Sequence, residues 1–295
     1  MRLLTFIEND ERRLGALVGA QVIDLAALLA AERPGARLFS DMRELIEQGP
    51  EFWSRLDAAL ARTDLTFFAR QLDRLKLDAP VRPSKIIAIG QNYYDHVREQ
   101  NAAMPDRPIV FTKFPTTIIG PGDEIRWEPA LSDKIDWEAE LAVVIGRTAR
   151  RVRSEDAYGY VFGYTVANDV TARDIQRADG QWVRGKSLDT FCPLGPWIVT
   201  RDEIPEPHGL PIRTHVNGQV MQNSHTDQLI FRVPMLIEFL SRAFTLLPGD
   251  VILTGTPPGV GAFRNPPVFL QDGDVVTVEV EGIGSLTNPC RAEVV

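Results

Sequence analysis

Short runs rich in apolar and β-branched residues, separated by glycine and proline, dominate the chain from residue 85 onward. Runs of this length and composition predict β-strands, and their close spacing favours antiparallel pairs. The expected strands cover residues 85–90, 109–113, 138–145, 161–168, 197–200, 213–216, 251–254 and 275–281. The sequence therefore predicts an α+β fold that is mostly β.

The first 79 residues have a different pattern. They are expected to form a hairpin and then two helices, at residues 2–8 with 15–25, 38–46 and 52–60. A run rich in proline and charge at residues 77–83 predicts a linker. We therefore predict an N-terminal accessory domain at residues 1–79, which lacks a cluster of chemistry-bearing residues, and a catalytic domain at residues 80–295.

Composition excludes several classes of partner. The 295 residues are 44% hydrophobic, which is enough for one large or two modest soluble domains. Acidic residues outnumber basic ones by 40 to 32 and no basic stripe is present, so we expect no nucleic-acid partner. The longest apolar runs have the length of buried strands, and the chain does not begin with a secretory signal pattern. We therefore expect no membrane partner and a cytoplasmic protein.

Three carboxylates next to the predicted strands form the first candidate site. Side chains alternate along a strand, so Glu138 and Glu140 are expected side by side on one face. Asp169 follows the hydrophobic strand at residues 161–168 and fits the same picture. Three anionic oxygens favour a hard divalent cation, Mg²⁺ or Mn²⁺, with Ca²⁺ also acceptable. The alternative is that Glu138 and Glu140 form the solvated face of an edge strand.

A histidine and a glutamate three residues apart form the second candidate site. If Asn92 caps a short helix, His96 and Glu99 lie on one face of that helix. A carboxylate beside an imidazole fixes its tautomer and raises its basicity, as a general base that activates water requires. The alternative is a weak, exposed surface pair. No comparable partner is expected for the other three histidines, which are His208, His215 and His225.

Five ordered segments, considered together, resemble the fumarylacetoacetate hydrolase family. They are residues 89–96, 138–141 with the Val-Ile-Gly that ends the same strand, 163–176, 185–193 and 248–261. The resemblance extends from about residue 85 to the C-terminus. It implies a mixed, mostly β sandwich-like roll, assembled as a homodimer, and it likens the N-terminal segment to the accessory domain of longer members.

The resemblance also implies roles for individual residues. The metal ligands would be Glu138, Glu140 and Asp169, and the water-activating dyad would be His96 and Glu99. Lys186 would lie beside the metal and polarise a substrate oxygen. The remaining substrate contacts would come from Arg173, Gln176 and Thr256.

The expected activity is metal-dependent hydrolysis of a C–C bond in a small β-diketo or 2-oxo acid, such as an acylpyruvate, fumarylpyruvate or a diketo-deoxy sugar acid. Fumarylacetoacetate itself is not expected, because residues 85–94 lack a carboxylate and residues 177–180 lack an aromatic side chain that the animal enzyme carries. An intact His96–Glu99 pair favours hydrolysis, with residues 93–101 as a lid.

Three alternatives remain open. The same metal site would serve decarboxylation of an oxaloacetate-like acid or isomerisation of 2-hydroxyhepta-2,4-diene-1,7-dioate. A non-catalytic metal-binding protein is a third reading. A dinucleotide-dependent oxidoreductase is disfavoured, because the glycine-rich run at residues 255–261 contains two prolines where a helix would begin.

Overall fold

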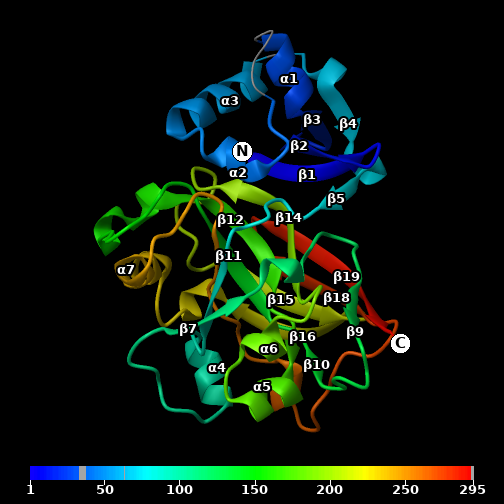
Figure 1. Cartoon of the computed structure of the whole chain (residues 1–295), viewed down its shortest axis with the longest axis vertical. Helices are drawn as coiled ribbons and strands as arrows, with labels where there is room; N and C mark the ends of the chain where they lie inside the picture. Colours follow the sequence, from blue (N-terminus) through cyan, green and yellow to red (C-terminus); the bar gives the residue numbers. More distant parts are fainter. Residues whose placement is uncertain (33–37, 63, 294–295) are drawn as a thin grey trace.

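The computed structural model describes residues 1–32, 38–62 and 64–293. Its largest sheet has the strand order β4-β3-β2-β1-β14-β12-β11-β17-β6-β7, with β5 paired to β1 and β8 to β14 (Figure 1). These strands are β1 (Arg2–Glu8), β2 (Glu11–Val18), β3 (Gln21–Asp24), β4 (Ala69–Gln71), β5 (Lys76–Asp78), β6 (Ile86–Gly90), β7 (Ile109–Lys113), β8 (Ile118–Ile119), β11 (Ala139–Ile145), β12 (Val161–Asn168), β14 (Cys192–Thr200) and β17 (Val251–Leu253).

A second sheet packs against the middle of the first. Its order is β16-β15-β18-β19-β9, and it contacts β11, β12 and β14. The strands are β9 (Ile125–Trp127), β15 (Pro211–Val216), β16 (Gln219–His225), β18 (Val275–Val280) and β19 (Gly284–Ala292), and β10 (Ile135–Asp136) pairs separately with β13 (Thr171–Ala172). The predicted mostly β, sandwich-like α+β fold is confirmed.

Strand β11 shows why this sequence forms the centre of the sandwich. Every residue of Ala139–Ile145 is buried. Leu141, Val143 and Ile145 belong to the core between the two sheets, whereas Ala142 and Val144 belong to the core shared with the N-terminal helices. A strand that is covered on both faces needs a continuous apolar run, and this one has it after Glu140.

Most of the helices lie at the two ends of the sandwich (Figure 1). Three pack in the N-terminal segment: α1 (Leu25–Glu32), α2 (Met42–Ile46) and α3 (Pro50–Arg62). Three short ones gather at the opposite end: α4 (Tyr94–Glu99), α5 (Arg173–Asp179) and α6 (Val183–Lys186). The longer α7 (Val233–Ala243) packs at the side. Among the helices of the described ranges, none has the length and apolar content needed to cross a membrane.

Several predicted boundaries were wrong. The second arm of the N-terminal hairpin is two strands, β2 and β3, because the chain turns back at Gly19, which has a φ of 60°. Helix α2 starts later than expected, since the Asp41 side chain accepts a hydrogen bond from the Arg43 N–H at 2.8 Å and caps the helix there. Helix α1 was not expected.

The predicted linker is partly a strand. Residues Lys76–Asp78 form β5, which is antiparallel to β1, and β1 also pairs with β14 through Leu3 and Ile198. The N-terminal segment therefore extends the main sheet without a break in hydrogen bonding. The division into domains at residues 1–79 and 80–295 stays a prediction.

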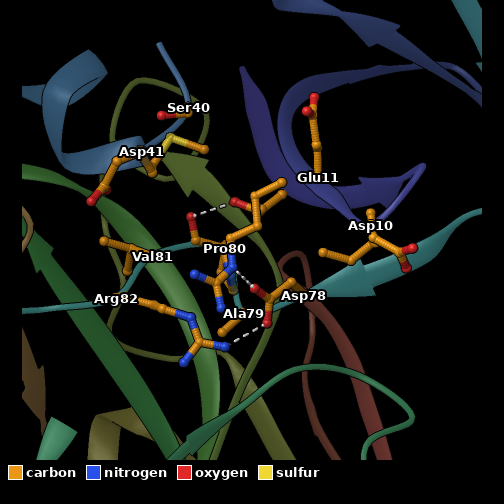
Figure 2. A pocket seen from close by; sticks show the side chains of 13 residues that line it. Asp10, Glu11, Ser40, Asp41, Asp78, Ala79, Pro80, Val81 and Arg82 are labelled. Atoms are coloured by element: carbon orange, nitrogen blue, oxygen red, sulfur yellow. Dashed lines mark hydrogen bonds and ion pairs between the residues drawn. The ribbon is translucent and has the colours of Figure 1, made fainter.

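Asp78 is an anchor point at this junction. A cavity of about 760 Å³ lies beside it, and Figure 2 shows Asp78 facing Arg82 on its wall. The Asp78 carboxylate accepts from Arg12 Nε at 2.6 Å, from Arg82 Nη2 at 2.9 Å and from the Ala79 N–H at 2.8 Å. These contacts link strand β2 to the start of the predicted catalytic domain.

Replacing Asp78 by asparagine is expected to lower the free energy of unfolding by about 2 kcal/mol at neutral pH, because two guanidinium groups lose their anion. Burial opposes ionisation, but Arg82, the Ala79 N–H and Arg12 hold the pKa of Asp78 below its ordinary value. The stabilisation is therefore present above the ordinary carboxyl pKa and is lost as pH falls through the lowered pKa. Urea unfolding at several pH values measures both effects.

The matched control is Asp10→Asn, on the same cavity wall. This exposed carboxylate forms no ion pair within the described part of the chain. Equal unfolding free energies for the Asp78 and Asp10 variants would contradict the assigned anchoring role.

Candidate metal centre and active site

The three predicted metal ligands meet in the buried interior. Glu138, Glu140 and Asp169 each place one carboxylate oxygen within 4.8 Å of the others, with residue exposures of 6%, 1% and 0%. Antiparallel pairing of β11 with β12 brings them together, and the Asp169 N–H donates to the Glu138 carbonyl at 2.9 Å. The alternative of a solvated edge strand is wrong, because β11 lies between β12 and β17.

Two buried lysines partly neutralise this carboxylate cluster. Lys186 Nζ donates to Glu138 Oε2 at 2.8 Å and to Asp169 Oδ2 at 2.7 Å. Lys113 Nζ donates to Asp169 Oδ1 at 2.7 Å. Burial favours the neutral acid, but Lys186 and Arg173 overcome it and lower the pKa of Glu138 to about 2. Glu138 is therefore held as a carboxylate.

Glu140 is the member of the cluster without a cationic partner. Within the described ranges it forms no salt bridge, and its Oε2 accepts only the Gly255 N–H, at 2.6 Å. Burial, together with the charges of Asp169 and Glu138, raises the pKa of Glu140 well above its ordinary value. A buried carboxylate in this situation requires a proton or a cation.

The donor set fits a divalent cation. Three carboxylate oxygens that can converge on one ion are the hard ligands that Mg²⁺, Mn²⁺ and Ca²⁺ prefer. An ion would also supply the positive charge that Glu140 lacks. The cluster could therefore bind a metal, and its oxygens do not select one of the three ions.

A cavity of about 280 Å³ opens beside this cluster. Six of the nine predicted site residues line it: His96, Glu138, Arg173, Gln176, Lys186 and Thr256. The other three contact residues that line it. Glu99 is bonded to His96, and Glu140 and Asp169 lie next to Glu138. The structure thus brings the nine residues to one place.

The imidazole of the His96–Glu99 pair is buried, whereas Glu99 reaches the surface. His96 Nδ1 lies 2.9 Å from Glu99 Oε2, and the two side chains are 7% and 22% exposed. The Gly259 N–H donates to the other Glu99 oxygen at 2.9 Å, which fixes the carboxylate in place. A carboxylate held in this way favours the tautomer in which Nδ1 carries the proton.

Asn92 does not cap helix α4, contrary to expectation. The N-cap residue is Tyr93, and it makes no side-chain capping bond. The Asn92 amide is buried and instead donates to the carbonyls of Thr254 at 2.7 Å and Phe231 at 3.0 Å. Asn92 therefore ties the loop before α4 to the strand β17 end of the site.

The three predicted substrate contacts have protein partners. Arg173 Nε pairs with Asp136 Oδ2 at 2.7 Å, and its Nη2 pairs with Glu138 Oε1 at 2.7 Å. Its Nη1 also donates to Gln176 Oε1 at 3.2 Å. Thr256 Oγ1 accepts from Gln222 Nε2 at 2.9 Å. Arg173 thus pairs with Glu138, one of the predicted metal ligands, and also lines the cavity.

Sequence reasoning missed three contacts. Lys113 ends the predicted strand at residues 109–113, and a lysine at the end of a buried strand is a signal that could have been used. Gln100 Nε2 lies 2.7 Å from His96 Nε2, which the sequence does not indicate. His208, expected to lack a carboxylate partner, pairs with Glu206 away from this cavity.

Comparisons with known proteins place the chain. The family model described as fumarylacetoacetate (FAA) hydrolase C-terminal matches residues 85–291. A Xenopus laevis protein named oxaloacetate tautomerase fahd2, mitochondrial, is 48% identical over 98% of this chain and 90% of the relative. The Bos taurus oxaloacetate tautomerase FAHD2A, mitochondrial, is 48% identical over 92% of this chain and 84% of the relative.

Solved structures agree over the whole length. The fumarylacetoacetate hydrolase EaFAH from Exiguobacterium antarcticum has a TM-score of 0.87 and 39% identity, over 99% of this chain and 100% of that one. A 5-carboxymethyl-2-hydroxymuconate delta-isomerase from Mycobacterium smegmatis has a TM-score of 0.77 and 39% identity, over 100% of both chains.

The names of the relatives overturn one prediction. A cytoplasmic protein was expected, but the Xenopus laevis and Bos taurus relatives are both named as mitochondrial. The reasoning failed because a secretory signal pattern bears only on the secretory pathway and carries no information about other compartments. The family model matches residues 85–291 and the relatives are 48% identical, so one conclusion follows: the chain belongs to the fumarylacetoacetate hydrolase family, whose enzymes act on small molecules.

Proposed function

We propose that the protein is a metal-dependent tautomerase that interconverts the keto and enol forms of oxaloacetate or a closely similar 2-oxo dicarboxylic acid. One observation carries the proposal: His96, Lys186 and the predicted metal ligand Glu138 line a single cavity of about 280 Å³. Ligand pockets usually measure about 300–1,000 Å³, so this one suits a small acid. The relatives named oxaloacetate tautomerase support the choice of substrate.

Each residue would have a simple task in this reaction. A divalent ion held by Glu138, Glu140 and Asp169 would polarise the 2-oxo group of the substrate. His96, oriented by Glu99, would remove a proton from C3. Lys186 Nζ would donate a hydrogen bond to the 2-oxo oxygen, where negative charge develops.

The change balances with one proton. C3 loses a proton to His96, the electron pair of that C–H bond forms the C2–C3 double bond, and the π pair of the 2-oxo group moves onto its oxygen. That oxygen takes a proton from the Lys186 ammonium, which solvent reprotonates as His96 releases its own proton. The reverse sequence restores the keto acid. No water is consumed and no carbon–carbon bond breaks, so the reaction requires only a base, an acid and a polarised carbonyl at the site.

Hydrolysis of a C–C bond in an acylpyruvate-type acid is the second candidate. The observation that favours it is the 2.9 Å contact between His96 and Glu99, because an oriented imidazole can activate water as well as remove a proton from carbon. The names of the relatives support the tautomerase more than this hydrolase, which the sequence alone favoured.

The deciding experiment follows the enol of oxaloacetate by its ultraviolet absorbance, with Mg²⁺, Mn²⁺ or EDTA, and runs acylpyruvates in parallel. Metal-dependent acceleration of enol decay without release of carbon dioxide is expected. Release of carbon dioxide would identify a decarboxylase, and cleavage of an acylpyruvate would identify the hydrolase. No acceleration with any of these acids would contradict an enzymatic role at this site.

Arg177 is expected to bind the second carboxylate of the substrate. It lies on α5, is exposed, lines the cavity and forms no ion pair within the described part of the chain. Replacing it by methionine should raise KM for oxaloacetate about tenfold, because one charge-assisted contact is lost, while kcat changes little. Steady-state kinetics measure this split.

The control substrate for Arg177→Met is a 2-oxo monocarboxylic acid, which has no second carboxylate. Its enolisation should be unaffected by the substitution. An equal rise in KM for both acids would assign Arg177 to a general electrostatic effect instead of recognition of a dicarboxylate.

A further inference from the structure

His96 Nε2 already has a hydrogen-bond partner. Glu99 binds Nδ1, so Nε2 carries the lone pair, and Gln100 Nε2 donates to this lone pair at 2.7 Å. Gln91 Nε2 donates to Gln100 Oε1 at 3.3 Å, which orients the Gln100 amide with its nitrogen toward His96. The hydrogen bonds therefore agree on one arrangement.

The occupied lone pair is the one that must accept the substrate proton. A primary amide is not a base, so while Gln100 donates to Nε2 the imidazole cannot remove a proton from carbon. His96, Gln91 and Gln100 all line the same 280 Å³ cavity. A substrate that enters the cavity therefore finds the Gln100 amide bonded to His96 Nε2. This amide must move away before His96 can accept the substrate proton.

The backbone permits the Gln100 side chain to leave alone. Gln100 is the C-cap of α4, and its N–H donates to the His96 carbonyl at 3.2 Å. The helix turn that carries His96 thus keeps this backbone hydrogen bond while the half-buried Gln100 side chain rotates. The amide then needs another acceptor, since an unpaired amide in a confined site costs free energy.

We propose that Gln100 is a latch on His96: the Gln100 amide blocks the Nε2 lone pair before substrate binds, and it transfers to an oxygen of a small 2-oxo acid when that acid binds. Gln100 is thus a positioning residue and a substrate contact together. The transfer rests on the proposed function, because it assigns His96 as the base. The blocked lone pair rests on the hydrogen bonds alone.

The first test measures how available the lone pair is. Diethylpyrocarbonate acylates an unprotonated imidazole nitrogen, and peptide mass spectrometry reports the rate at each histidine. In substrate-free protein, Gln100→Met should accelerate modification of His96 about tenfold, because the blocking hydrogen bond is gone, and leave exposed His225 unchanged. Gln91→Met should give a smaller acceleration, because it removes only the contact that orients Gln100.

The second test measures the transfer without turnover. Oxalate binding to the Mn²⁺-loaded protein, followed by calorimetry, should weaken about tenfold in Gln100→Met, because the acid loses a donor. The matched control is Gln48→Met, which removes an exposed amide that donates to the Glu44 carbonyl at 3.0 Å, and it should change neither result.

The outcomes separate the latch from the function. Unchanged His96 modification in Gln100→Met, with an unchanged thermal midpoint, would overturn the latch. Faster modification with unchanged oxalate affinity would overturn the transfer. If the wild-type protein fails to accelerate enolisation while His96 modification still responds to Gln100, the proposed function is wrong and the blocked lone pair stands.

Discussion

Replacing Glu140 by glutamine is expected to lower kcat on the order of 1,000-fold and to weaken Mn²⁺ binding about 100-fold. The amide has nearly the same shape as the carboxylate and still accepts from the Gly255 N–H. It removes the one cluster charge that forms no salt bridge within the described ranges. Steady-state kinetics with added Mn²⁺ and calorimetric titration of chelator-treated protein measure the two losses.

The same substitution is expected to stabilise the metal-free protein by about 2 kcal/mol at neutral pH, because the neutral amide can be buried as it is, whereas the carboxylate must first take up a proton. The raised pKa of Glu140 means that the metal-free folded state holds a proton that the unfolded chain releases above its ordinary carboxyl pKa. Stability of the metal-free wild type should therefore fall as pH rises from about 4 toward the raised pKa. Glu140→Gln should flatten that fall.

A variant at Glu140 that loses activity but gains stability in the metal-free protein identifies Glu140 as a metal ligand. If the Glu140 carboxylate served only the fold, replacing it would destabilise the metal-free protein. The control is Glu128→Gln, on the exposed surface, which should change neither property. A destabilised metal-free Glu140→Gln protein that still binds Mn²⁺ at the wild-type affinity would remove Glu140 from the metal centre.

Replacing His96 by alanine is expected to lower kcat about 100- to 10,000-fold, because positioned general bases contribute rate factors of this size. Mn²⁺ affinity should stay close to that of the wild type, since His96 is not one of the three predicted metal ligands. Glu99→Gln should cost less, because the imidazole remains but loses its fixed tautomer. Enol decay and C3 deuterium exchange in heavy water measure the effect.

The matched control for His96→Ala is His225→Ala, which removes an exposed imidazole from β16. Its kinetics should equal those of the wild type. Undiminished C3 exchange in His96→Ala would show that another group removes the proton, and the tautomerase assignment of His96 would fall with it.

Elements with strong local signals were predicted well. The expected strands at residues 109–113 and 161–168 coincide with β7 and β12. Errors gathered where a distant partner decides the structure. β5 was taken for a linker because its strand character depends on pairing with β1, and Asn92 was taken for a cap although it binds Phe231 and Thr254.

The candidate site was predictable where the chemistry lies along one strand. Alternation along the expected strand at residues 138–145 placed Glu138 and Glu140 together before any partner was known. Lys113 and Gln100 were missed because their roles come from contacts with Asp169 and His96 that local patterns do not encode.

The reaction was the least accessible property. An imidazole beside a carboxylate predicts a base, but the base is the same whether the proton comes from water or from carbon. The residue pattern therefore could not separate hydrolysis from tautomerisation, and the preference for hydrolysis came from that pair alone. The homodimer stays a prediction, because it was inferred only from the family.

The continuous sheet makes the two parts of the chain depend on each other for solubility. Strand β1 satisfies backbone groups of β14 near Ile198 and Val199. If residues 1–79 were removed, this stretch would become an open, apolar template for strand addition by other chains. The N-terminal segment therefore covers an edge of the sheet formed by the rest of the chain as well as extending that sheet, and fragments that begin after residue 79 would carry an aggregation hazard.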